Sequence, residues 1–171
     1  MRKFLALGAL ALATAAVLPT VGWAQLAADN PDWKESDAPP APQFDMARLL
    51  PFDVAAASSL RFGVDPATIS ITPDGLVRYV VVASNSSGAM NAMYEGVRCA
   101  TSEVRTYARF TTSGGWKPVV NSDWQSLAVT TLPRHSSILA KLAFCTGGRA
   151  PQASVDRIVR TLKGTLNESK N

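Results

Sequence analysis

A period-two alternation of polar and apolar residues runs through the middle of the chain and limits the folds that it can adopt. The segment "ATISIT", the turn "PDG" at 73–75 and the β-branched run "LVRYVVVAS" predict a hairpin. After a second turn, "NSSG" at 85–88, residues 89–99 and 103–112 predict two more strands around "CATS", and "SGG" at 113–115 closes the last. Consecutive strands joined by short turns pair antiparallel, so this region predicts an antiparallel β-meander.

The last third of the chain changes to helical spacing. In "RHSSILAKLAFC", Ile138, Leu142 and Cys145 recur at that spacing, and Gly147 offers a stop. Ser154 is a good N-cap for a second helix, whose apolar stripe consists of Val155, Ile158, Val159, Leu162 and Leu166. The predicted fold class is therefore α+β, an antiparallel β-meander sheet with two C-terminal helices packed on one face.

The N-terminus has the three parts of a secretory signal peptide. Arg2 and Lys3 precede an apolar stretch that ends near Leu18, and small residues at Gly22 and Ala24 predict cleavage after Ala24. A retained signal anchor is the alternative, but the stretch is shorter than the ~20 residues that a spanning helix needs. No cysteine lies in or just after the stretch, so a lipid anchor has no acceptor. We expect residues 1–24 to be a signal peptide and the product to have no stable membrane insertion.

The next segment, residues 25–43, is rich in proline, aspartate and alanine. Its prolines at positions 31, 39, 40 and 42 predict an extended arm with polyproline character. Trp33 and, just after the arm, Phe44 are candidates to anchor it to the folded body. Residues 44–171 are expected to form a single globular α+β domain.

Charge is divided unevenly along the mature chain. Residues 25–74 carry eight acidic and three basic side chains, a net charge of −5, whereas residues 75–171 carry five acidic and twelve basic ones, a net charge of +7. Either the acidic front lies on the basic remainder, or the basic part faces an anionic partner. A third alternative is that both sets are solvated and unrelated in space.

Cys99 and Cys145 are the two cysteines of the chain. In an exported protein an even count favours a disulfide between them. The competing hypothesis makes Cys99 a nucleophile or redox thiol, with Glu95, Arg98 or His135 nearby. The sequence has no C-x-x-C pair, and its one histidine, His135, has no sequence neighbour that points to Cys99, so the disulfide is favoured.

The familiar catalytic and cofactor motifs are missing. One histidine and two paired cysteines leave few ligands for zinc, and Asp65 and Asp74 lack the spacing of a calcium loop, so we expect no metal site and no cofactor. There is no nucleophile elbow, no S-x-x-K and no phosphate-binding glycine motif. No catalytic residue is assigned, although Glu95 and Glu103 leave open a glycan-hydrolysing carboxylate pair.

The remaining positive feature is a set of arginines and tyrosines in the predicted strands. On strict alternation, Glu103, Arg105, Tyr107 and Arg109 share one face, and Val104, Thr106, Ala108 and Phe110 share the other. Tyr94, Arg98 and Arg78 are candidates to join the polar face. The predicted ligand-binding residues are Arg98, Arg105, Tyr107 and Arg109, which could bind a carboxylate, phosphate or peptide. The alternative is the ordinary solvated face of an antiparallel sheet.

Long strings in the chain resemble a known family. They are "SSLRFGVDPATISITPDGLVRYVVVASNSSGAMNAMYEGVRCATSEVRTYARF", "GGWKPV", "NPDWKE", the proline stretch and "LLPFDV", which together extend from Asn30 to about Cys145. They resemble the CNP1-like family of exported proteins, named after a cryptic neisserial protein. The resemblance implies export to the periplasm of a Gram-negative bacterium, and it implies no reaction, cofactor or catalytic residue.

We therefore expect a non-enzymatic binding or accessory protein of the bacterial cell envelope, located in the periplasm. Its expected partner is an anionic envelope ligand or a periplasmic protein, and no nucleic acid. One alternative is an envelope enzyme, for example acting on peptidoglycan, with a site drawn from Tyr94, Glu95, Glu103 and His135. Another is a structural factor whose proline-rich arm docks a larger assembly.

Overall fold

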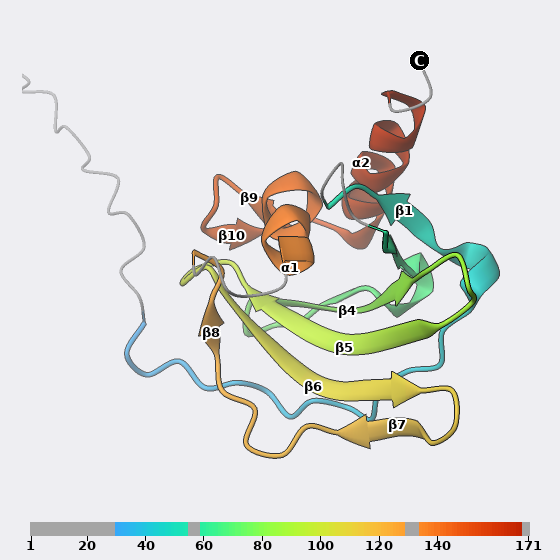
Figure 1. Cartoon of the computed structure of the whole chain (residues 1–171). Coiled ribbons are helices and arrows are strands. Elements are labelled where there is room, and N and C mark those ends of the chain that lie inside the picture. The colour runs from blue at the N-terminus through green and yellow to red at the C-terminus, as the bar shows by residue number, and fades with distance from the viewer. Residues whose placement is uncertain (1–29, 55–58, 129–133, 169–171) are drawn as a thin grey trace, which may run out of the picture.

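The computed structural model describes residues 30–54, 59–128 and 134–168, and it confirms the predicted antiparallel sheet (Figure 1). The predicted signal peptide, 1–24, lies outside the described residues. Six strands pair side by side in the order β1, β2, β4, β5, β6, β7, every neighbouring pair being antiparallel. Short strands β3 and β8 pair with β4 and β6. The bounds are β1 Leu50–Phe52, β2 Arg61–Val64, β3 Ser70–Ile71, β4 Leu76–Ser84, β5 Met90–Arg98, β6 Glu103–Thr111, β7 Gly115–Pro118 and β8 Gln125–Ser126.

The two predicted C-terminal helices are present, so the α+β fold class is confirmed. Helix α1, Arg134–Leu139, runs into a turn of π-helix at Ala140–Phe144, and α2 spans Val155–Glu168. A two-stranded ladder, β9 Cys145–Thr146 and β10 Ala150–Pro151, lies between them. Single 3₁₀ turns occur at Met46–Arg48 and Pro66–Thr68.

One face of the sheet, here called the helix face, packs against α1 and α2 (Figure 1). Ser154 caps α2 as predicted, because its Oγ accepts a hydrogen bond from the Arg157 amide at 3.3 Å. The main core lies between these layers and contains Val77, Tyr79, Val81, Met93, Val97, Leu139, Phe144, Ile158 and Leu162. This burial of apolar area is the main term that holds the helices on the sheet.

The opposite face, here called the arm face, is covered by the N-terminal arm, which is blue in Figure 1. A second buried cluster lies there, made of Val80, Val82, Ala92, Tyr94 and Ala108, with Ala41, Phe44 and Leu49 packed against it. Strand β4 is consequently buried on both faces from Leu76 to Ala83, as the unbroken β-branched run would require. The alternative of an ordinary solvated outer face is wrong for this part of the sheet.

The strict alternation predicted for β6 is also wrong beyond Tyr107, because the ladder contains a β-bulge. Tyr94 pairs with Ala108 but Glu95 pairs with Thr106, so Tyr107 is an extra residue on β6. A bulge reverses the faces of the residues that follow it. Ala108 therefore points to the arm face with Tyr107.

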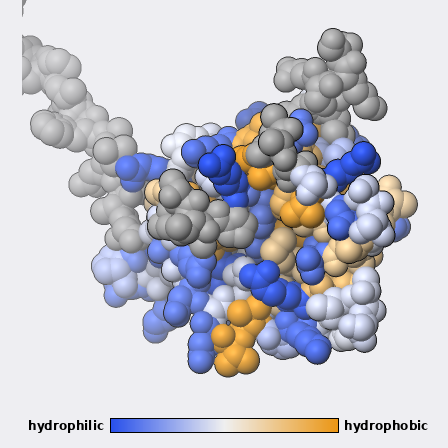
Figure 2. Space-filling view, viewed as in Figure 1, coloured by the Kyte–Doolittle hydropathy of each residue, from blue (hydrophilic) through white to orange (hydrophobic). Residues whose placement is uncertain are grey.

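Cys99 and Cys145 form the expected disulfide, with their Cα atoms 5.6 Å apart. Cys99 is fully buried just after β5, and Cys145 begins β9 directly after the π-helical turn. The bond thus ties the end of a central strand to the end of the first helical segment. No helix among the described residues is long and apolar enough to cross a membrane. On the side of the molecule that Figure 2 shows, hydrophobic residues lie in small patches between hydrophilic ones.

Candidate anion-binding site

The centre of the arm face is a carboxylate held by three side-chain donors. Glu35 of the arm accepts from Arg105 Nη1 to its Oε2 at 2.7 Å and from Tyr107 Oη to its Oε1 at 2.7 Å. Trp124 Nε1 donates to Oε2 at 3.2 Å. Arg78 Nη2 lies 3.7 Å from Oε1 and adds a second positive charge. Guanidinium, phenol and indole donors converge on one carboxylate, which is the chemistry of an anion-binding site.

Arg78 connects this centre to the backbone of the arm. The residue is only 3% exposed, although it is charged, because its guanidinium lies between the sheet and the arm. Its Nη1 donates to the carbonyl of Asp37 at 3.2 Å, and its Nη2 donates to the carbonyl of Ser36. A buried arginine needs such acceptors to offset its desolvation. Arg78 therefore binds backbone groups and the Glu35 carboxylate at once.

The predicted turn at "PDG" holds the start of the arm. Asp74 accepts from the Ser36 amide at 2.8 Å and from the Ser36 hydroxyl at 3.0 Å, and its own carbonyl accepts from Trp33 Nε1 at 2.8 Å. Burial raises the pKa of Asp74, but hydrogen bonds from Thr72 and Ser36 outweigh it and leave the pKa below its usual value. Asp74 thus stays an ionised acceptor at neutral pH.

Aromatic rings enclose one end of the arm face. The guanidinium of Arg98 lies 3.8 Å from the ring centroid of Trp33, within cation–π range. Trp33 in turn meets Trp124 edge to face at 5.9 Å. Arg98 Nη1 also lies 3.8 Å from Glu103. Trp33 is thus an anchor of the arm, as predicted, and so is Phe44, which packs edge to face on Phe110 and Trp116.

Tyr107 reaches Glu35 only because residue 96 has no side chain. A Cβ built at Gly96 would lie 2.5 Å from Tyr107 Oη and 2.9 Å from its Cε2. The phenol ring therefore lies across β5 in the space that Gly96 leaves open. Burial, followed by the hydrogen bond that Tyr107 donates to the Glu35 carboxylate, raises the pKa of Tyr107 well above its usual value. Tyr107 remains a protonated donor.

The structure separates the four predicted ligand-binding residues. Arg98, Arg105 and Tyr107 lie on the arm face, together with Arg78, which the sequence offered as a further member. Arg109 lies on the other face, because it follows the bulge and pairs with Met93 of the main core, and it is exposed. Grouping Arg109 with this surface was therefore an error that the bulge explains.

Two members of the site were missed in the sequence, the acceptor Glu35 and the donor Trp124. Glu35 is 70 residues from Arg105 in the chain. The only signal for it was the split of charge between an acidic front and a basic remainder. At Glu35 the first alternative holds, since the acidic arm lies on basic strands.

Hollows lie beside the arm on this face. One of about 440 Å³ is bordered by Ala38–Ala41 of the arm and by Tyr94, Arg105, Tyr107, Ala108, Pro118, Val119 and Ser122. A second, of about 280 Å³, is bordered by Glu35–Ala38, Arg105 and Tyr107. Arg105 and Tyr107 border both hollows, and Glu35 borders the second, so two of the donors to the carboxylate lie beside open space.

A second polar cluster lies inside the main core. Glu95 accepts from Tyr79 Oη at 2.7 Å and Ser136 Oγ at 3.0 Å, and His135 Nε2 lies 3.0 Å from the same oxygen. All four residues are 2% exposed or less. Burial raises the pKa of Glu95, but the attraction of His135 and the hydrogen bonds with His135, Tyr79 and Ser136 outweigh it and lower the pKa. This cluster fastens α1 to β4 and β5 within the main core.

The carboxylate pair suggested for glycan hydrolysis does not form. Glu95 points into the main core on the helix face, whereas Glu103 lies on the arm face, where Thr101 Oγ1 donates to it at 2.6 Å. Tyr94 also faces the arm, with its ring 5.2 Å from that of Tyr107. Among the described residues, no three His, Cys, Asp or Glu side chains gather as a metal site would require.

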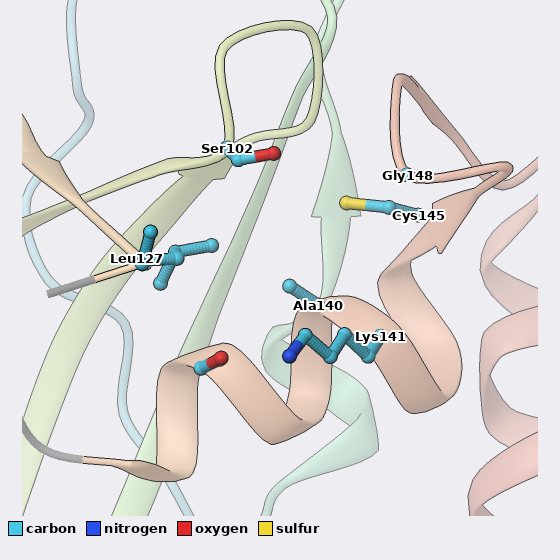
Figure 3. A pocket seen from close by; sticks show the side chains of 8 residues that line it. Ser102, Leu127, Ala140, Lys141, Cys145 and Gly148 are labelled. Atoms are coloured by element: carbon cyan, nitrogen blue, oxygen red, sulfur yellow. The ribbon is translucent and has the colours of Figure 1, made fainter. Parts of the chain in front are cut away.

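A pocket of about 230 Å³ lies beside the disulfide (Figure 3). It is lined by Ser102, Leu127, Ala128, Ser137, Ala140, Lys141, Cys145 and Gly148. Figure 3 shows the sulfur of Cys145 directed toward it. Lys141 is the one titratable group among these described residues, and a lone amine does not make an acid–base pair. The arm face is therefore the stronger candidate for a binding site.

The fold and the arm face define an α+β domain that holds its own N-terminal arm by carboxylate recognition. By its sequence, the chain belongs to the CNP1-like family, whose family model matches residues 28–163. The match includes the arm, the whole meander and most of α2, so the arm is part of what the family model describes. No curated protein and no solved structure matches the chain.

Proposed function

We propose that this protein is an exported, non-enzymatic binding or accessory protein of the bacterial cell envelope. It acts in the periplasm and binds a carboxylate-bearing ligand or partner through the arm face. The observation that carries the proposal is the convergence of Arg105, Tyr107 and Trp124 on the Glu35 carboxylate. Donors preorganised around one carboxylate suit other carboxylates of the same geometry.

Spare hydrogen-bonding capacity supports the same proposal. Among the described residues, Arg78 Nε and Arg105 Nε are buried without a hydrogen-bond acceptor. Buried polar groups in proteins are normally paired, and Arg105 borders both hollows, so its unpaired Nε favours an additional acceptor at this place. A ligand in either hollow that accepted from Arg105 Nε would use a donor that Glu35 leaves free.

Two features of the sequence and fold support export. The first 24 residues have the composition of a cleaved signal peptide. The disulfide between Cys99 and Cys145 suits an oxidising compartment such as the periplasm.

Localisation and contact can be tested together in the bacterium that encodes the protein. A photo-cross-linking amino acid placed at Ala38, an exposed arm residue that borders both hollows, should give an adduct with an envelope component in the periplasmic fraction. The same amino acid at Val120, which is 82% exposed and borders neither hollow, is the matched control. The mature protein should begin at Gln25.

Charge reversal tests whether the Ala38 adduct depends on the arginines of the arm face. Arg105→Glu should abolish the Ala38 adduct, because it replaces a donor to the bound carboxylate by a like charge. Arg109→Glu, on the opposite face, should leave it unchanged. An adduct that survives Arg105→Glu, or that forms equally at Val120, would contradict the proposal.

A further inference from the structure

We propose that the arm face recognises an extended, proline-containing acidic segment of another envelope protein, and that residues 33–42 occupy the surface as an internal segment of the same chemistry. This inference rests on the proposed function and names the class of partner. It rests on three features of how the folded body holds the arm. In chain order along the arm, they are donors to the Glu35 carboxylate, donors to backbone carbonyls and a hollow beside the proline stretch.

The first contact selects an acidic residue. The Glu35 carboxylate meets Arg105, Tyr107 and Trp124, and Arg78 lies close by. Charge-assisted hydrogen bonds of this kind are stronger than neutral ones and discriminate against an uncharged amide. The partner therefore needs an aspartate or glutamate at this position.

The second set of contacts selects an extended backbone and no particular side chain. Arg78 donates to the carbonyls of Ser36 and Asp37, and Trp116 Nε1 donates to the carbonyl of Pro42 at 3.1 Å. Every peptide has such carbonyls, so another segment in the same conformation would satisfy these donors. The described part of the arm forms no helix and no strand before the turn at Met46.

The third contact favours prolines. Ala38–Ala41 border the hollow of about 440 Å³, whose other lining residues include Tyr94, Tyr107 and Pro118. At the end of this stretch Trp116 Nε1 donates to the carbonyl of Pro42. Grooves lined by aromatic rings, with an indole that donates to a carbonyl, are a recurrent way of binding polyproline segments. Prolines also hold the chain extended before binding, so less conformational entropy is lost.

The spacing adds a specific requirement. The sequence "ESDAPPAP" places the carboxylate four residues before the first proline of the stretch. Four residues of polyproline helix span ~12 Å. We infer that a partner segment carries its acidic residue about four positions before its prolines, with the same chain direction.

The tethered arm sets the conditions of the test. A short tether gives an effective concentration of about millimolar, so a segment in trans competes poorly with an intact arm. Replacing Glu35 by Gln removes the charge of the internal occupant and leaves Trp33, Phe44 and the apolar cover in place. The Glu35→Gln protein should therefore bind an external segment that the wild-type protein excludes.

The experiment uses the full mature chain and a fluorescent peptide of residues 30–43, "NPDWKESDAPPAPQ", as the probe. Fluorescence anisotropy should show binding to Glu35→Gln about tenfold tighter than to wild type. Adding Arg105→Gln should weaken that binding about tenfold, and adding Arg109→Gln should not change it. Three control peptides should each bind less well than the parent peptide. The first is scrambled, the second carries Glu35→Gln, and the third has alanine in place of the prolines at 39, 40 and 42.

Equal binding of the parent and scrambled peptides would overturn the inference, and so would absence of binding to a Glu35→Gln protein with a wild-type melting temperature. If Glu35→Gln unfolds, Trp33→Ala, which loosens the arm through its contacts with Asp74 and Arg98, takes its place. A dimer that appears on arm release and disappears with Arg105→Gln would show that a second copy is the occupant, and would overturn the choice of another protein. An Ala38 adduct in cells without peptide binding would reject this inference and leave the proposed function standing.

Discussion

Substituting Gly96 by alanine should disrupt the site around Glu35, because the added methyl group displaces the ring of Tyr107. The new Cβ would lie 2.5 Å from Tyr107 Oη and 2.9 Å from Cε2, which is closer than a Cβ approaches non-bonded atoms. Gly96 lies in the middle of β5 and pairs with Arg105 on β6, so the backbone there has little room to shift. The ring of Tyr107 must therefore move and lose its hydrogen bond to Glu35.

The magnitude follows from three terms. A hydrogen bond to a charged group is worth ~1.5 to 3 kcal/mol, and the lower end applies here because Tyr107 is partly exposed. Overpacking adds ~1 to 3 kcal/mol, whereas replacing glycine by alanine in a strand returns ~0.5 to 1 kcal/mol. The net loss is ~1.5 to 4 kcal/mol, and at ~2 to 4 °C per kcal/mol for a domain of this size the melting temperature should fall by ~3 to 16 °C.

Thermal unfolding followed by circular dichroism measures this loss, with Gly164→Ala as the matched control. Gly164 is an exposed helical residue with nothing within 4 Å of an added Cβ, so its substitution should be neutral or stabilise by up to ~1 kcal/mol. In a Tyr107→Ala background the Gly96→Ala change should cost much less, because the ring is gone. An unchanged melting temperature, or an equal cost in both backgrounds, would refute the reasoning.

Four further predictions concern the core, the disulfide and the arm. Glu95→Gln should lower the free energy of unfolding by about 3 kcal/mol at pH 7, since it leaves the buried His135 without its carboxylate; an unchanged urea midpoint would count against it. The lowered pKa of Glu95 also predicts that its contribution to wild-type stability is complete above the usual glutamate pKa of about 4.3 and is lost as pH drops through the folded-state pKa. Glu95→Gln should reduce this loss of stability at acidic pH, and an identical pH profile of the two proteins would argue against the ion pair. Reducing the bond between Cys99 and Cys145, which are 46 residues apart, should cost ~4 kcal/mol by thermal unfolding, and two alkylatable thiols in unreduced periplasmic protein would disprove the bond. Glu35→Gln should speed amide hydrogen exchange at Ser36 but not within α2, and equal rates at Ser36 would mean that the carboxylate does not hold the arm.

The sheet and its helices were predictable because each rests on a local pattern. The alternation around the turn at 73–75 and the run "LVRYVVVAS" became β3 and β4, and the apolar stripe after Ser154 became α2. Such patterns report which side of an element is buried, and burial dominates the energetics of a domain. The disulfide was predictable for a different reason, since two cysteines allow a single intramolecular pairing.

The faces of β6 were not predictable, because one extra residue reverses them. Nothing in "SEVRTYARF" marks Tyr107 as the bulged residue; the bulge is visible only in the pairing of β6 with β5. Arg109 was therefore placed with Arg105, although the two point to opposite faces. Glu95 was likewise offered as a carboxylate partner of Glu103, because its actual partner His135 is 40 residues away on another element.

The arm illustrates a further limit, because its role depends on contacts over about 70 residues of sequence. A proline-rich segment after a signal peptide would ordinarily be a linker. Here it has two separable roles: Ala41 contributes to an apolar cover that continues after the arm in Phe44 and Leu49, and Glu35 fills the polar site. Deleting the arm would remove Glu35 and part of the cover over Val80, Val82 and Tyr94 together, so loss of binding after deletion would not distinguish a missing ligand from an unfolded sheet. Single substitutions at Glu35 leave the apolar cover intact, and for this reason they are the changes that can separate recognition from stability.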